Sequence, residues 1–229
     1  MAIRAVLFDF DDTLGNREEY SHRTYAQRIE ECFADEDPWI KEAAVQMCLI
    51  YDQHGDVKKK FVQERLLKTM NLDIGDLETY WEGHQYLNAV LYPDARMVVE
   101  ELRKRGYRTG IITNGDSHNQ HEKIRRTGIE DLMDVIVVSG DTDTRKPEPE
   151  IFRLAAEQLG LACEECAFVG DMFLNDVLGA RNAGMFPVWV WPHGSRYAEI
   201  DVVQIHSLSE LLPWFPCPGS EPGKGGSGK

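Results

Sequence analysis

Residues 3–14 read Ile-Arg-Ala-Val-Leu-Phe-Asp-Phe-Asp-Asp-Thr-Leu. The first six of them, residues 3–8, are apolar except for Arg4 and rich in branched side chains, which is typical of a buried strand. Parallel sheets covered by helices on both faces produce such near-continuous apolar runs. Two acids and a hydroxyl, Asp9, Asp11 and Thr13, follow at once. The stretch therefore predicts a central parallel strand with a polar site at its carboxyl end.

The rest of the chain beyond Pro93 alternates between strand and helix patterns. Strands are expected at 108–113, 135–138, 167–170 and 186–191, and helices at 94–105, 118–127, 148–159 and 175–183. This alternation predicts an α/β fold, a doubly wound (Rossmann-like) parallel sheet with helices on both faces. Ligands of such sheets bind outside the carboxyl ends of the strands.

Residues 16–91 have a different character, because they are rich in charge and show helical spacing. Asp37-Pro38 favours a helix start, with proline at the first helical position. Gly55 and Gly75 favour helix ends. We expect three or four helices that form a small all-α domain, inserted into a core of residues 1–15 and 92–215.

The charge balance limits the possible partners. With 25 basic and 39 acidic residues, the formal charge is −14. Such a surface repels nucleic-acid backbones and anionic membranes, and an anionic substrate then needs a local positive site. No apolar stretch approaches the roughly 20 residues of a membrane span. We therefore expect a small-molecule substrate, with neither nucleic acid nor membrane as partner, and make no prediction of oligomeric state.

Cysteine content and the composition of the last residues give two further expectations. The chain has five cysteines, an odd number in a chain too long to need disulfides, which favours reduced thiols and a cytoplasmic location. Cys163 and Cys166 form a C-x-x-C pair that precedes a strand, so we interpret it as packing rather than redox chemistry. Residues 216–229 are rich in Pro, Gly, Ser and Lys, and we expect them to be disordered.

Metal- and phosphate-binding groups stand at the ends of successive expected strands. They are Asp9, Asp11 and Thr13; Thr113 and Asn114; Lys146; and Gly170, Asp171 and Asp176. A single Asp at a strand end is more often a cap or turn residue, but here four strands end in such groups. Carboxylates gathered at one edge repel each other unless a cation lies among them. Hard oxygen ligands at this density favour Mg²⁺.

These strand-end groups resemble, in order, the four motifs of the haloacid dehalogenase superfamily. The matching stretches are Asp9-Phe10-Asp11-Asp12-Thr13 for D-x-D-x-T, Thr113-Asn114-Gly115, Lys146-Pro147, and Gly170-Asp171 with Asp176. The resemblance covers nearly the whole chain except the tail. The insertion at 16–91 resembles the helical cap of one branch, and the run from Thr113 through Gln120 and Lys123 to Lys146 resembles nucleotidase and sugar-phosphatase members.

The resemblance implies a Mg²⁺-dependent phosphohydrolase that acts on a small phosphate monoester, such as a nucleotide monophosphate or a sugar phosphate. Asp9 would be the nucleophile and form an aspartyl-phosphate. Asp11 would be the general acid and base. Mg²⁺ would be held by Asp9, by the backbone carbonyl of Asp11 and by Asp171.

The remaining motif residues would support this chemistry. Thr113 and Lys146 would hold the substrate's phosphoryl oxygens and stabilise the charge of the transferred group, and Asn114 would also bind substrate. Lys146 would also screen Asp9 from Asp171. Thr13 and Asp176 would orient the metal ligands rather than bind the metal themselves.

Three alternatives remain open on the residues. Hydrolytic dehalogenation would use Asp9 on carbon, but an alkyl halide needs no acid at Asp11. Phosphonate cleavage would need a buried cap lysine, for which Lys41 and Lys68 are candidates. A non-enzymatic receiver domain also carries a phosphoacceptor Asp, but its acid pair and phosphoacceptor lie on different strands.

Overall fold

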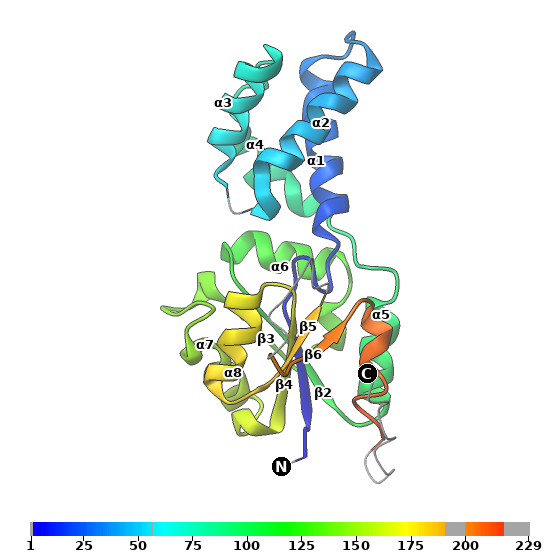
Figure 1. The fold of residues 1–229 in the computed structure, drawn as a ribbon, viewed down its shortest axis with the longest axis vertical. Coiled ribbons are helices and arrows are strands. Elements are labelled where there is room, and N and C mark those ends of the chain that lie inside the picture. Colours follow the sequence, from blue (N-terminus) through cyan, green and yellow to red (C-terminus); the bar gives the residue numbers. More distant parts are fainter. Residues whose placement is uncertain (1, 56, 191–199, 218–229) are drawn as a thin grey trace. The chain divides into compact units, whose positions relative to one another are not determined.

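The computed structural model describes residues 2–55, 57–190 and 200–217. The chain forms two compact units. Residues 16–90 make up one, called here the helical unit, and residues 1–15 and 91–229 make up the other, called the sheet unit (Figure 1). Each unit has its own buried core.

Within the described residues, the sheet unit contains a sheet of six strands in the order β3-β2-β1-β4-β5-β6. The strands are β1 Ala5–Phe8, β2 Arg108–Thr113, β3 Val135–Val138, β4 Cys166–Gly170, β5 Phe186–Val190 and β6 Val203–Ile205. Every neighbouring pair is parallel. This confirms the predicted α/β fold with a doubly wound parallel sheet, in which β1 is central.

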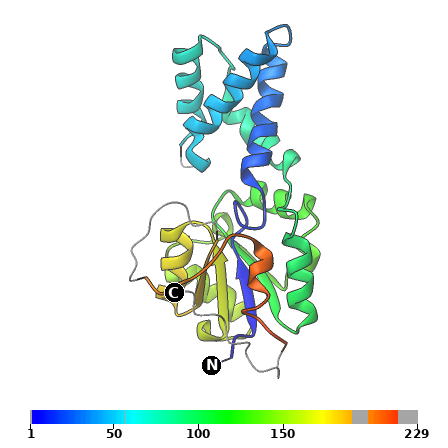
Figure 2. The same ribbon diagram turned by 45° about the vertical axis from the view of Figure 1, so that its right-hand side comes forward.

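The sheet has a buried core on each face because β1 alternates its side chains. Val6 and Phe8 pack with residues of α5 (Ala95–Lys104), whereas Ala5 and Leu7 pack with residues of α7 (Pro149–Gln158) and α8 (Gly179–Ala183). Figure 2 shows α5 and α8 on opposite sides of the sheet. Burial on both faces explains why the strand is continuously apolar.

Two elements of the sheet unit differ from the expectation: one expected helix has another form, and one strand was not expected. The helix expected at 175–183 is a π-helical segment, Phe173–Leu178, followed by α8. The Asp176 side chain accepts a hydrogen bond from the Met172 N–H at 2.9 Å and so closes the start of this segment. Strand β6 carries too short an apolar run to be predicted. The last residue of the strand expected at 186–191 lies outside the described residues.

The helical unit consists of consecutive helices linked by short turns. They are α1 Arg17–Cys32, α2 Pro38–Asp52, α3 Lys59–Met70 and α4 Leu77–His84, with 3₁₀ turns at Gln53–Gly55 and Gln85–Asn88. Asp37 caps α2 through the Trp39 N–H, and Pro38 is its first residue, as predicted. Helix α2 ends at the left-handed residue Gln53, and the 3₁₀ turn that follows it ends at Gly55, where a stop was predicted. The helix end predicted at Gly75 was wrong, since the left-handed residue that ends α3 is Asn71.

A buried ion cluster lies inside the helical unit. Asp52 accepts a hydrogen bond from Arg17 at 3.0 Å and also binds the Lys59 ammonium, and all three side chains are buried. Burial lowers the pKa of Lys59 to about 8, and the Asp52 carboxylate opposes that shift. The Lys59 ammonium also lies over the Trp81 ring, 4.0 Å from its centroid. One carboxylate therefore serves two buried cations.

Two further expectations concern membrane-spanning helices and the last residues of the chain, and the described residues bear on both. None of its helices combines the length and the apolar character that crossing a bilayer requires. At the start of the expected tail, the Pro216 carbonyl accepts a hydrogen bond from Tyr107 at 2.9 Å. Residues 218–229 lie outside the described residues, so the disorder expected there stays a prediction.

Replacing Asp52 by Asn should destabilise the helical unit strongly. The substitution leaves Arg17 and Lys59 buried without their carboxylate, and breaking a buried ion pair costs about 3–5 kcal/mol. Chemical denaturation of the full chain, followed by circular dichroism, measures the loss. Glu82→Gln, at an exposed position of α4, is the control and should change the free energy of unfolding by less than about 0.5 kcal/mol. Equal stability of the two variants would contradict the assignment.

Candidate active site

The ammonium of Lys146 lies between two buried carboxylates. Lys146 Nζ donates to Asp9 Oδ1 at 2.6 Å and to Asp176 Oδ1 at 2.7 Å. Burial alone would lower the pKa of Lys146, but Asp176 and Asp9 outweigh it and raise that pKa above its usual value. Lys146 therefore stays charged. Its second carboxylate partner is Asp176, which the sequence did not predict. The Lys146 charge also opposes the raised pKa of Asp171, and the screening of Asp9 from Asp171 stays a prediction.

Asp9 stands directly after β1, at the carboxyl edge of the sheet. Its backbone N–H donates to the Val169 carbonyl of β4 at 2.9 Å, which continues the ladder by one residue. Its Oδ1 is taken by Lys146, and Oδ2 accepts no hydrogen bond from any described residue. The arrangement fixes the carboxylate at one oxygen and presents the other.

Three carboxylates meet at this edge and fit a divalent cation. Oxygens of Asp9, Asp171 and Asp176 lie within 4.8 Å of one another. Burial raises the pKa of Asp9 to about 7 against the opposing Lys146 charge. Burial, and then the Asp9 carboxylate, raises the pKa of Asp171 to about 8. The raised pKa values mean that Lys146 alone does not balance the negative charge of the ionised carboxylates. A divalent cation would balance it, and a donor set made only of oxygens suits Mg²⁺.

Asp176 is less available to a metal than the other two carboxylates. Its Oδ1 accepts from Lys146 and its Oδ2 from the Met172 N–H, and the side chain is buried. A Cβ on Gly170 would lie 2.4 Å from the Asp176 side chain, so only glycine admits this approach. The glycine of the fourth motif is therefore required by packing against Asp176. These contacts suit a residue that orients Lys146.

Asp171 is held by groups from two other segments. The Thr13 hydroxyl lies 3.5 Å from Asp171 Oδ1, and Trp189 Nε1 donates to the Asp171 carbonyl at 2.9 Å. Thr13 is fully buried. Thr13 could be predicted from its motif but Trp189 could not, because a tryptophan within an apolar strand gives no sign of which backbone group it will contact.

The turn after β2 fixes the position of Lys146. The Asn114 side chain donates to the Lys146 carbonyl and accepts from the Lys146 N–H, both at 2.9 Å. Thr113, the last residue of β2, is buried. Asn114 therefore positions the lysine backbone, and contacts of Thr113, Asn114 and Lys146 with substrate stay predictions.

The Asp11 side chain is held by α6 (Ser117–Arg126). Lys123 Nζ donates to both Asp11 oxygens, at 2.7 and 2.6 Å, and Gln120 Nε2 donates to Oδ2 at 2.9 Å. Residues 120 and 123 are three apart, so they share one face of the helix. That spacing is the signal by which sequence reasoning could have placed them together.

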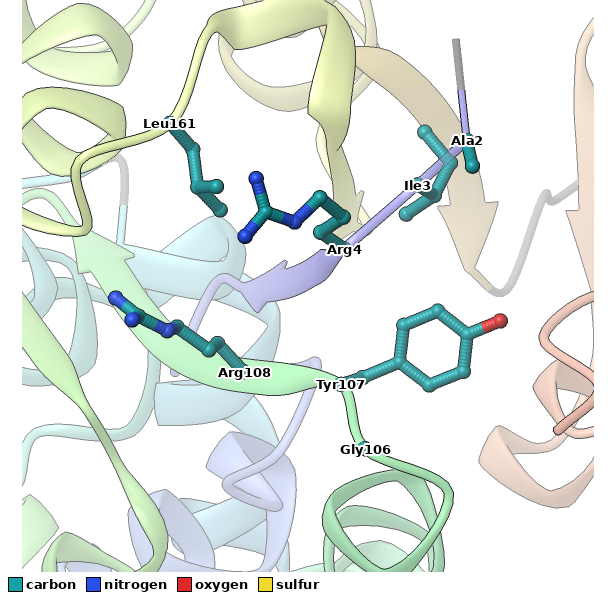
Figure 3. A pocket seen from close by; sticks show the side chains of 7 residues that line it. All are labelled: Ala2, Ile3, Arg4, Gly106, Tyr107, Arg108 and Leu161. Carbon is teal, nitrogen blue, oxygen red and sulfur yellow. The ribbon is translucent and has the colours of Figure 1, made fainter. Parts of the chain in front are cut away.

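A histidine of α6 and a cavity lie apart from these groups. On α6, His121 pairs with Asp141 at 2.8 Å, which agrees with a helix-surface position. A cavity of about 310 Å³ is lined by the residues labelled in Figure 3, among them Arg4 and Arg108. It lies at the amino ends of β1 and β2, the edge of the sheet opposite Asp9.

The chain resembles known hydrolases over most of its length. A family model described as haloacid dehalogenase-like hydrolase matches residues 3–184. A glyceraldehyde 3-phosphate phosphatase of Pyrococcus furiosus is 30% identical over 207 residues, which cover 87% of this chain and 85% of the relative. Human N-acylneuraminate-9-phosphatase is 29% identical, with 92% and 91% of the two chains covered.

Solved structures of related hydrolases are also similar to this chain over most of its length. A HAD phosphatase from Thermococcus onnurineus has 30% identity and a TM-score of 0.61, with 91% of this chain and 96% of that chain covered. The putative HAD hydrolase YfnB of Bacillus subtilis has a TM-score of 0.73 at 23% identity, with 92% and 97% covered, and bears on the fold alone.

The affinity of the site for Mg²⁺ should rise with pH through about 7 to about 8. Asp9 and Asp171 have raised pKa values of about 7 and about 8, so at lower pH protons occupy the groups that must be ionised to bind metal. Isothermal titration calorimetry with Mg²⁺ in buffers of different ionisation enthalpy should detect proton release at pH of about 7. A Mg²⁺ affinity that is constant from about pH 6 to about pH 9 would contradict the assignment.

Proposed function

This chain belongs to the haloacid dehalogenase-like hydrolases, and we propose that it is a Mg²⁺-dependent phosphohydrolase. In this proposal it cleaves a small phosphate monoester through an aspartyl-phosphate on Asp9. The observation that carries the proposal is the pair of carboxylates after β1. Asp9 is fixed by Lys146, and Asp11, two residues later, is held by Lys123.

In the first step, Asp9 attacks the phosphorus of the bound ester. A bond forms between an Asp9 carboxylate oxygen and phosphorus, and the bond to the ester oxygen breaks. Asp11 donates a proton to that leaving oxygen, so an alcohol departs rather than an alkoxide. Lys146, together with Thr113, neutralises charge on the phosphoryl oxygens, which is the main way proteins promote phosphoryl transfer.

In the second step, water replaces the aspartate. Asp11, now a carboxylate, accepts a proton from the attacking water, and the bond between phosphorus and Asp9 breaks. Inorganic phosphate leaves and Asp9 is restored. An acid–base residue beside the nucleophile therefore favours a short-lived phosphoenzyme, which argues against the receiver-like alternative.

Mg²⁺ would be held by Asp9, Asp171 and the backbone carbonyl of Asp11, and when bound it supplies positive charge to the phosphoryl oxygens. Asp176 and Thr13 would keep the neighbouring side chains in place through their contacts with Lys146 and Asp171. Carboxylate oxygens of Asp9 and Asp171 within 4.8 Å of each other support these two residues as ligands.

The substrate class is proposed to be a phosphorylated sugar or sugar-like acid. The similar proteins carry names of phosphatases for glyceraldehyde 3-phosphate and N-acylneuraminate 9-phosphate. The helical unit is inserted between Gly15 and Leu91, and we propose that it acts as a cap that selects the substrate. A cap favours small substrates because it must close over them.

The structure leaves little support for phosphonate cleavage through a cap lysine. Lys41, one candidate, is paired with Glu30 at 2.8 Å, and Lys68 is exposed. The buried lysine of the helical unit, Lys59, has a pKa lowered to about 8 by burial, but its amine is bound to Asp52 and would have to leave that carboxylate to form a Schiff base. Dehalogenation is disfavoured by the presence of Asp11.

Phosphate release should require both Mg²⁺ and Asp9. A panel of sugar phosphates, nucleotide monophosphates and phosphorylated hydroxy acids is assayed with and without Mg²⁺, for wild type and Asp9→Asn. Asp9→Asn should lower kcat by more than about 10⁴-fold, because the amide cannot form the covalent intermediate. Asp131→Asn, at an exposed position of the sheet unit, is the control and should have the kcat of wild type. Turnover that survives complete chelation of metal would instead favour dehalogenase-type chemistry.

Asp11→Asn should separate acid–base chemistry from metal binding. Loss of the carboxyl removes a proton donor and acceptor, which is worth about 10²–10⁴-fold in rate. The backbone carbonyl remains, so the affinity for Mg²⁺ should stay within about threefold of wild type. Steady-state kinetics and calorimetry measure the two quantities. Loss of metal affinity equal to the loss of rate would mean that the Asp11 side chain is itself a metal ligand.

A further inference from the structure

Two buried side chains of α6 donate hydrogen bonds to the Asp11 carboxylate. Lys123 Nζ lies 2.7 Å from Oδ1 and 2.6 Å from Oδ2, and Gln120 Nε2 lies 2.9 Å from Oδ2. Lys123 is 2% exposed and Gln120 is 4% exposed. A lysine amine within reach of both oxygens fixes the plane of the carboxylate as well as its place.

The position of these two donors is fixed by the fold. The Asp116 side chain caps α6 through the Asn119 N–H at 3.0 Å, and Ile124 is buried in the core that also contains Phe8 and Phe10. In Figure 1, α6 lies at the carboxyl end of the sheet. The helix therefore cannot rotate without exposing its apolar side, and the two donors stay aimed at Asp11.

A chain of hydrogen bonds links the donors of Asp11 to Asp9. Gln120 Nε2 also donates to the Asn114 carbonyl at 2.8 Å, so one amide group bridges Asp11 and the turn after β2. The side chain of the same Asn114 holds the backbone of Lys146, whose ammonium binds Asp9. Both reacting carboxylates are therefore positioned from one turn.

We propose that Lys123 and Gln120 are positioning residues for the acid–base step, which hold the Asp11 carboxylate in the orientation that meets the leaving oxygen and the attacking water. The inference rests on the proposed function, in which Asp11 moves both protons. An aspartate side chain otherwise has several staggered rotamers open to it. Misplacement of a reacting group by about 1 Å can cost about 10²-fold in rate.

A merely structural ion pair makes a different prediction. If Lys123 only stabilised α6, its loss would reduce the amount of folded protein and lower all activities by the same factor. If it positions Asp11, the loss depends on how much the leaving group needs a proton. An alkyl phosphate needs protonation of its leaving oxygen, whereas p-nitrophenyl phosphate releases a stable anion.

The test uses the full-length protein with Mg²⁺ and compares Lys123→Met with wild type on these two esters. We expect kcat/KM for the alkyl phosphate to fall by about 10²-fold and that for p-nitrophenyl phosphate by about tenfold or less. The loss on the alkyl ester should lie in kcat, with KM within about threefold. Lys123→Arg should recover much of the rate, because a guanidinium also donates to both carboxylate oxygens. Lys104→Met, at an exposed position of α5, should behave as wild type.

Crystal structures of wild type and Lys123→Met provide a readout that does not depend on activity. We expect the Asp11 carboxylate to leave its wild-type position in the variant. An unchanged ratio between the two esters, or an Asp11 side chain that keeps its place, would overturn the inference. If wild type hydrolysed no ester, the proposed function would fail, and the two crystal structures would still decide whether Lys123 positions Asp11.

Discussion

The ammonium of Lys146 lies among buried carboxylates and offsets the repulsion between their negative charges. Asp9 and Asp176 each place an oxygen within 2.7 Å of its nitrogen, and Asp171 has oxygens within reach of both acids. Removing the amine would leave several buried negative charges at one edge of the sheet, which costs several kcal/mol. The other features of the site follow from keeping this amine in place: Asn114 holds its backbone, and Gly170 leaves room for Asp176.

Much of the site could be predicted from sequence because a parallel sheet brings its carboxyl ends to one edge. Once residues 3–8 are taken as a central strand, Asp9 must face the same crevice as Thr113 and Asp171. The alternating pattern beyond Pro93 gives the neighbouring strands, and the match of β2 and β3 to their expected bounds reflects strong apolar runs between turn residues. The fold class therefore follows from periodicity and order alone.

Other features depend on three-dimensional packing that no local pattern encodes. The pairing of Lys146 with Asp176 could not be read from the sequence, because it depends on the π-helical segment that places the Asp176 side chain against Gly170. Lys59 is buried by partners from two other helices, although its neighbours in sequence, Lys58 and Lys60, are exposed. Helix ends also shifted, since Gln53 and Asn71 adopt left-handed conformations usually left to glycine. The contact of Trp189 with Asp171 is of the same kind.

The central claim is that Asp9 carries the phosphoryl group, and trapping the phosphoenzyme tests it most directly. Asp11→Asn is mixed with Mg²⁺ and an aryl phosphate that wild type hydrolyses, such as p-nitrophenyl phosphate. Its leaving group needs no proton from residue 11, so formation of the intermediate proceeds while its breakdown is slowed. The reaction is quenched in acid within milliseconds and digested for mass spectrometry. The account predicts that the peptide containing Asp9 gains the mass of one phosphoryl group, located on Asp9 by fragmentation. A phosphoryl group on another residue, or hydrolysis with no covalent phosphate at any time point, would contradict it.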